Sequence, residues 1–341
     1  MTKTRLPVII AAVMALLLVA APMAYADTEG GVGGAFKAKN KLPEVTGLVA
    51  PDMTPQAEWT TITVTVEDKN KLVDVQEVYV AVFFDLGDTD PDPAPDVANT
   101  QTCAILTATR TGPGAWDWTI APAPAPGVST WDINAVGCSA PADTLSSGTW
   151  TFSFKVGKVA TEAPGADNWD AYAKAKDTVN YGTTDLFDRD KAMDWWGEIG
   201  TPSPASVDWD EVEPGTGFTT DNVNVVGAIS INYIANGDYD QKVKSSDNWS
   251  GGTQWAILDA IDNCANPNEF ALKADDDDTI AGAPQLDTSG VSIDATGTLT
   301  VEAGHDEVDN HLWLKLASIF SQSDAAENKY TGIITYAIVN R

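Results

Sequence analysis

Four aspartates in the first half of the chain have the spacing of a calcium-binding loop. In the stretch DLGDTDPDPAPD they stand at the first, third, fifth and ninth places of such a loop: Asp88, Asp90, Asp92 and Asp96. A hard cation prefers carboxylate oxygens that converge from a tight turn. Two positions depart from the pattern, because Pro93 replaces the turn glycine and Asn99 replaces the final bidentate acid. The stretch therefore predicts a calcium site or a solvated hairpin loop, and calcium is the one cofactor we expect.

The two histidines stand together in the stretch GHDEVDNH, as His305 and His311. The acids between them would suit zinc, but the spacing does not match the helical HExxH motif, and Gly304 and Asn310 favour a turn. We therefore interpret both histidines as surface residues of an acidic loop. The acidic run at residues 275–278 is interpreted as solvated.

Motifs of catalysis are missing from the sequence. It contains no G-x-S-x-G elbow, and no glycine-rich phosphate loop follows a strand pattern. Paired carboxylates could cleave glycosides, but 49 acidic residues ensure that some pairs lie close whatever the function. We therefore expect a protein that is not an enzyme.

Residues 1–26 have the features of a secretory signal peptide. Lys3 and Arg5 precede an apolar run that is too short for a stable membrane span, and Ala24-Tyr25-Ala26 fits a cleavage site. The mature chain is then expected to begin at Asp27, with no nearby cysteine to serve as a lipoprotein anchor. Since no later stretch approaches a membrane-spanning length, we predict an extracellular or cell-surface location.

Charge and composition narrow the choice of partners. Loss of the leader removes two basic residues and changes the net charge from −29 to −31. Such a surface repels nucleic acid and anionic lipid, so neither is an expected partner. A hydrophobic content of 43% with 12 tryptophans excludes a disordered acidic tail. The length exceeds one typical core and predicts two domains.

Alternation of apolar and polar residues predicts β-strands throughout residues 44–181. The clearest pair reads GTWTFSFKVGK and then WDAYAKAKD, two aromatic-rich strands joined by a polar connection. Such a pair is typical of the closing strands of an immunoglobulin-like sandwich. Further strand candidates, at residues 61–66, 78–84, 102–109 and 115–120, bring the total to about six or seven with no helix.

Three runs of this first predicted domain carry a family resemblance. They read TITVTVEDKNKLVDVQEVYVAVFFD, GTWTFSFKVGK and WDAYAKAKD, and the resemblance covers roughly residues 44–180. They resemble the Ig-like modules of prokaryotic secreted surface and S-layer-type proteins, in which a V-x-V-x-D strand end precedes a short turn and a W-x-a-x-A-x-D strand closes the fold. The resemblance implies a sandwich at a cell surface and no particular activity.

Residues 182–204 are expected to form the junction between two domains. Leu186, Met193 and Trp196 could share one helical face, whereas residues 200–204 cannot continue any element. Adjacent Trp195 and Trp196 cannot both point into one sheet face. We expect them to fill the seam between the domains or to form an aromatic platform for a sugar or a protein partner.

Residues 205–341 are predicted to form a second β-sandwich. Its best strand candidates lie at residues 228–234, 269–274, 296–302, 311–317 and 330–339. The last of these resembles the final strands of secreted β-sandwich coat and fibre proteins. Residues 255–264 are a helix candidate, since Trp255, Leu258 and Ile261 are spaced by three. The fold prediction is therefore all-β, with two Ig-like or jelly-roll-type sandwiches in tandem after a cleaved signal peptide.

Three cysteines in an exported chain predict one disulfide and one cysteine left over. Cys103 and Cys138 fall in the same predicted domain and are the expected pair. Their loop would restrict the unfolded chain by roughly 3–4 kcal/mol in the chain-entropy model. Cys264 is then a buried thiol or a link to another chain. Asn248-Trp249-Ser250 is the one glycosylation sequon, and it predicts an exposed loop at Asn248.

Residues 27–43, DTEGGVGGAFKAKNKLP, are glycine-rich and then basic, which is typical of a flexible arm. The arm is either a disordered terminus or a segment that orders against a neighbouring subunit. With the other features, it suggests a secreted surface-layer, filament or matrix protein of structural or adhesive role. Its partners would be itself, other surface proteins or a polysaccharide. A carbohydrate-binding module is the alternative, and a glycoside hydrolase is the third.

Overall fold

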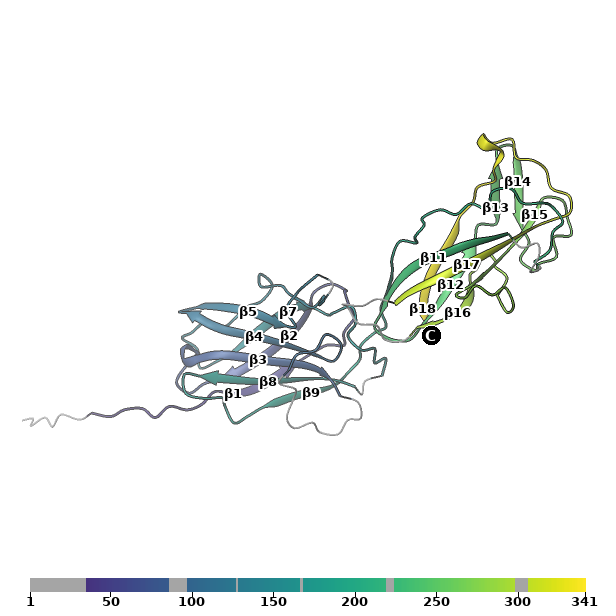
Figure 1. Cartoon of the computed structure of the whole chain (residues 1–341). Helices are drawn as coiled ribbons and strands as arrows, with labels where there is room; N and C mark the ends of the chain where they lie inside the picture. The colour runs from purple at the N-terminus through teal and green to yellow at the C-terminus, as the bar shows by residue number, and fades with distance from the viewer. Residues whose placement is uncertain (1–34, 86–96, 127, 166–167, 219–223, 298–305) are drawn as a thin grey trace, which may run out of the picture. The chain divides into compact units, whose positions relative to one another are not determined.

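The computed structural model describes residues 35–85, 97–126, 128–165, 168–218, 224–297 and 306–341 (Figure 1). The regular structure of these residues is all-β, apart from short 3-10 turns at Leu72–Asp74 and Ala326–Asn328. The described residues contain no helix long and apolar enough to cross a membrane. Residues 41–341 form one compact unit, separate from residues 1–40.

Nine strands among the described residues of the first half form two antiparallel sheets, which we call the first sheet pair. The four-stranded sheet has the order β1 (Glu44–Val49), β2 (Thr60–Glu67), β7 (Ser147–Lys155) and β6 (Asp132–Ile133). The five-stranded sheet has the order β5 (Ala115–Ala121), β4 (Cys103–Gly112), β3 (Val75–Phe84), β8 (Trp169–Asp177) and β9 (Leu186–Lys191). The predicted all-β class is confirmed, and the layers are consistent with a β-sandwich.

Strand alternation explains the core of the first sheet pair. Ile62 pairs with Phe152 and Val64 pairs with Trp150, and all four side chains are fully buried. They face the alternate residues of β3, such as Val80, across the gap between the sheets. The polar residues between them point away from this core, as a period of two requires.

The second sheet pair is built from the other nine strands that the structure describes. The six-stranded sheet has the order β10 (Gly197–Ile199), β11 (Asn224–Ala235), β17 (Asp306–Leu316), β15 (Glu269–Asp275), β14 (Gln254–Leu258) and β13 (Asn248–Gly251). The three-stranded sheet has the order β16 (Val291–Gly297), β12 (Tyr239–Ser245) and β18 (Ile334–Asn340). All these pairings are antiparallel except that of β14 with β15. One hydrophobic core joins the two sheets.

The helix expected at residues 255–264 is wrong. Residues 254–258 form β14, with Ala256 and Leu258 buried and Trp255 and Ile257 exposed. Residues three apart lie on opposite faces of a strand, so Trp255 points to solvent and Leu258 points to the core. The spacing by three therefore does not mark a helical face here. Turns follow, and the carboxylate of Asp259 accepts main-chain hydrogen bonds there.

The shared helical face expected within residues 182–204 is also wrong. Leu186 starts β9, which pairs with β8 and so belongs to the first sheet pair. Met193 is buried in the first core, where it bridges Met53 and Ala163. β10 follows in the second sheet pair, so much of the expected linker is paired within the sheets.

Candidate functional site

The described part of the N-terminal arm is exposed. Residues 35–41 have no regular structure, and Phe36 presents 97% of its surface to solvent. Lysines at 37, 39 and 41 alternate with Ala38 and Asn40. The arm leads directly into β1, where Pro43 is buried and the main-chain N–H of Lys41 donates to Asn70 Oδ1 at 2.7 Å.

The base of this arm is held by a close approach to the loop after β8. The main-chain N–H of Gly182 donates to Ala175 O at 2.9 Å, which places Gly182 against the carbonyl of Pro43. A Cβ at position 182 would collide with that carbonyl oxygen. Glycine is therefore required at position 182 for this loop to approach the carbonyl of Pro43.

Sheet edges are the other surface that bears on assembly, because an edge strand offers unpaired N–H and C=O groups to another strand. β18 is the outer strand of the three-stranded sheet, and it pairs with β12 along all seven of its residues. Ile334, Tyr336 and Ile338 pack against the second core, while Thr335 and Ala337 are exposed. The strand contains no charged residue.

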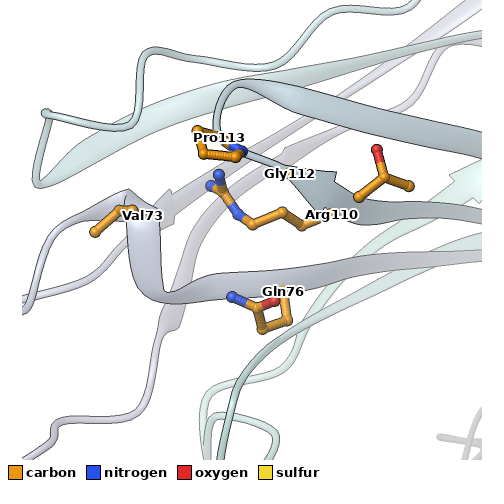
Figure 2. A pocket seen from close by; sticks show the side chains of 6 residues that line it. Val73, Gln76, Arg110, Gly112 and Pro113 are labelled. Atoms are coloured by element: carbon orange, nitrogen blue, oxygen red, sulfur yellow. The ribbon is translucent and has the colours of Figure 1, made fainter.

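Arg110 lines a shallow hollow of about 280 Å³ at the end of the first sheet pair. Figure 2 shows it with Val73, Gln76 and Pro113 around it. Its guanidinium donates to Val75 O at 2.7 Å, to Leu72 O at 2.8 Å and to both carboxylate oxygens of Asp143 at 2.9 Å.

The guanidinium also lies 4.6 Å from the ring centre of Trp116. Most donors of the guanidinium are thus used by Val75, Leu72 and Asp143. We therefore interpret Arg110 as a structural tie, a side chain that links these segments, and not as an anion site. Sequence analysis did not single out Arg110. The signal available was its position: a charged residue close to a predicted strand of apolar and small residues.

The disulfide expected between Cys103 and Cys138 is wrong, because all three cysteines are free. Cys103 packs with Phe83 and Tyr172 on the face of the five-stranded sheet that points away from the first core. Cys138 lies beside β7 in the other sheet, where its sulfur is 3.2 Å from the main-chain nitrogen of Ser153. The two thiols are therefore in different layers.

Burial makes these thiols poor nucleophiles, because it disfavours the thiolate. It raises the pKa of Cys103 to about 12 and that of Cys264 to about 11. Cys264 is a buried free thiol, packed against Ala271 and Ala317.

The predicted calcium ligands Asp88, Asp90, Asp92 and Asp96 lie outside the described residues, so calcium binding stays a prediction. Among the described residues, no three acidic, histidine or cysteine side chains form a group that could hold a metal ion.

The second acidic run differs from the solvated loop that we expected. Asp275 ends β15 and is buried, whereas Asp277 and Asp278 are exposed. Burial, reinforced by the neighbouring acids, raises the pKa of Asp275 to about 6. His311 pairs with Asp275 in β17, so the turn expected around Asn310 is a strand. His305 lies outside the described residues.

Trp195 and Trp196 are both half-buried. Trp195 packs against the second core, and its indole N–H donates to Asp238 O at 3.1 Å. Trp196 has the ammonium of Lys158 at 5.4 Å from its ring centre. Both indoles thus use part of their surface for contacts within the chain. A role as a binding platform stays a prediction.

Asn248 is exposed at the start of β13, as the sequon requires, and its amide donates to Asp247 at 3.0 Å. Trp249 of the same sequon is buried and donates to Ser245 Oγ at 3.1 Å. Glycosylation of Asn248 stays a prediction.

Comparison with known proteins adds no family to these observations: no protein-family model matches the chain, and no curated protein matches it.

Proposed function

We propose that this chain is a secreted structural or adhesive component of a cell surface, and that it acts by assembly with copies of itself. In this proposal the two sheet pairs are tandem Ig-like or jelly-roll-type sandwiches, and the leader at residues 1–26 directs export. The signal-peptide pattern and the resemblance of residues 44–180 to prokaryotic surface modules support the location.

One observation carries the proposal: residues 35–41 extend from β1 as an exposed segment with Phe36 almost wholly in solvent. An exposed aromatic ring is unfavourable in a free tail and favourable at a contact. A basic segment is also what a strongly acidic chain needs at a contact between copies, because the repulsion is reduced locally. The edges of the sheets supply acceptors for such a segment.

Particle size of the purified mature protein tests the proposal. We expect wild type to form large particles at high concentration with calcium present, and a variant lacking residues 27–41 to stay monomeric. The matched control lacks only residues 27–34 and keeps the alternating basic segment, so it is expected to assemble. A monomeric wild type, or equal assembly of the variant that lacks residues 27–41, would overturn the proposal.

Carbohydrate binding is the second candidate function, and one observation favours it. Trp255 lies on the exposed face of β14 with 53% of its surface in solvent, and exposed aromatic rings stack on sugars. A glycan array on the monomeric deletion variant tests this candidate. Specific binding that is lost in Trp255→Ala would support it, and absence of binding to any glycan would exclude it.

A further inference from the structure

We infer that β18 is the edge strand that receives the arm of a second copy of this chain. The inference rests on the proposed function and names the partner surface within it. The segment that binds is residues 35–41, and the acceptor is the unpaired side of β18 in the next copy. The contact would be an added β-strand.

The first argument is how the sheet edges are protected. Natural proteins place charges on edge strands to prevent pairing with other chains. In the part of the chain that the structure describes, all the other edge strands but one contain a charged residue: Glu44 in β1, Asp117 in β5, Asp132 in β6, Arg189 in β9, Glu198 in β10 and Asp294 in β16.

The exception, β13, has only four residues, and its Ser250 is already bridged to Thr331. β18 has seven residues, no charge and an exposed isoleucine, Ile333, just before it. It is therefore the long edge without charge protection in the described part of the chain, as an edge that is covered in an assembly would be.

The second argument is the pattern of the arm. Residues 35–41 alternate with a period of two. If they form a strand, the lysines lie on one face and Phe36, Ala38 and Asn40 lie on the other. A strand rises about 3.3 Å per residue, so the seven-residue arm is long enough to pair with six residues of β18 in a register offset by one residue. The face with Phe36 would then continue the row of Ile334, Tyr336 and Ile338 at the border of the second core.

Charge fits this orientation. The lysine face of the arm would lie on the solvent side, beside the exposed and uncharged Thr335 and Ala337. Lys242 and Lys244 of β12 lie on that same side of the sheet. They would be two strands, or about 9.6 Å, from the lysines of the arm, and salt at physiological concentration largely screens the repulsion between exposed charges at that distance. A strand with the opposite facing would bring the ammonium groups against the core border, where their desolvation is costly.

Engineered cysteines test the contact directly. We expect Lys39→Cys with Ala337→Cys, two positions on the same face of the proposed strand pair, in a Cys138→Ser background, to form a ladder of disulfide-linked multimers under mild oxidation. The matched control joins Lys39→Cys with Thr119→Cys, an exposed position of the edge strand β5. It should stay monomeric on a non-reducing gel. Equal ladders, or a ladder in the control alone, would overturn the choice of β18. A compact cross-linked monomer would show that the arm covers its own edge, and would also overturn it.

A charge placed on the edge gives the second test. Ala337→Lys restores the missing protection at an exposed position, so we expect it to abolish assembly with an unchanged melting temperature. Thr119→Lys is the matched control and should assemble like wild type. If Ala337→Lys still assembles while deletion of residues 27–41 prevents assembly, this inference fails and the proposed function stands. If wild type is monomeric, both fail.

Discussion

The two sheet pairs are built alike but differ in what fills them. The core of the first is apolar and aromatic, with Trp131, Trp150 and Trp169 all fully buried, and its fully buried carboxylates, Asp68 and Asp177, lie at strand ends, where they accept main-chain N–H groups. The core of the second contains buried amides, because Gln241 and Asn310 are fully buried among its aromatic residues.

These amides form a connected network. Gln241 Nε2 donates to Asn310 Oδ1 at 2.7 Å, and Asn310 Nδ2 in turn donates to Val308 O at 3.2 Å. The nearby phenol of Tyr233 is also buried, and burial raises its pKa. Bonds of this kind require one specific partner, whereas apolar contacts accept many.

The comparison shows two ways to hold two sheets together. The first pair gains stability from buried area and close packing. Truncating a side chain of its core should therefore lower the free energy of unfolding in proportion to the volume removed. The core of the second pair contains amides that must be hydrogen-bonded. The loss of stability on replacing one amide should therefore depend on whether its hydrogen-bond partner is left unsatisfied. The following predictions separate these two cases.

The largest effect is expected in the first core. Trp150→Ala removes a fully buried ring that lies 5.5 Å from Trp116 in an edge-to-face arrangement. We expect a loss of about 3–5 kcal/mol in the free energy of unfolding, measured with denaturant. Trp59→Ala is the control, because Trp59 is partly exposed, and it should cost far less. A similar loss in both variants would contradict an energetic role of packing at Trp150.

The next largest loss of stability is expected from the ion pair between Arg110 and Asp143 in the first sheet pair. Asp143→Ala leaves the guanidinium of Arg110 without its carboxylate, and the Arg110 side chain is only 7% exposed. Breaking a buried pair leaves an uncompensated charge, so we expect a loss of about 3 kcal/mol. Asp117→Ala, at an exposed position of β5, is the control. Should Asp143→Ala unfold at the same denaturant concentration as wild type, Arg110 is not a structural tie.

The second core should respond in a coupled way. Gln241→Leu leaves Asn310 without its partner, and we expect a loss of about 1–3 kcal/mol. The double variant with Asn310→Leu removes both amides, so it should lose less than the sum of the single variants. A double-mutant cycle in denaturant measures this coupling. Strict additivity would show that the two amides act independently.

The smallest effect is a pH dependence in the second sheet pair. The pKa of Asp275 is raised from 3.8 to about 6, so between these values the folded state binds more protons than the unfolded state. The contribution of this group to stability therefore falls as the pH rises from about 4 to about 6. We expect Asp275→Asn to remove that fall and to raise the melting temperature at pH 7. Asp278→Asn is the exposed control. Identical pH profiles of wild type and Asp275→Asn would exclude this role.

Sequence reasoning predicted strands where the alternation was unbroken. The rows that contain Ile62 and Trp150 became β2 and β7, because one buried face demands a period of two. It failed at residues 255–264, where Trp255, Leu258 and Ile261 fit one face of a helix, while Ala256 and Leu258 fit one face of a strand. Only the pairing of β14 with β13 and β15 decides between them.

The candidate site was predicted in part. The exposed arm was evident from composition, because its glycines and lysines cannot form a core. The unprotected edge was not, because whether a strand lies at an edge depends on the order of strands in the sheet. The sequence contains the residues of β18, but their pairing with β12 alone among the described strands is a property of the tertiary fold.

The cysteines show the same division most clearly. The sequence by itself determined that Cys103 and Cys138 belong to the same run of strands, and composition determined the acidic, aromatic and β-rich character of the chain. Only the tertiary structure decided that the two thiols lie in different layers and remain free. The physical reason is that alternation assigns residues to two opposite faces, but only packing decides which face becomes the core and which strand becomes an edge.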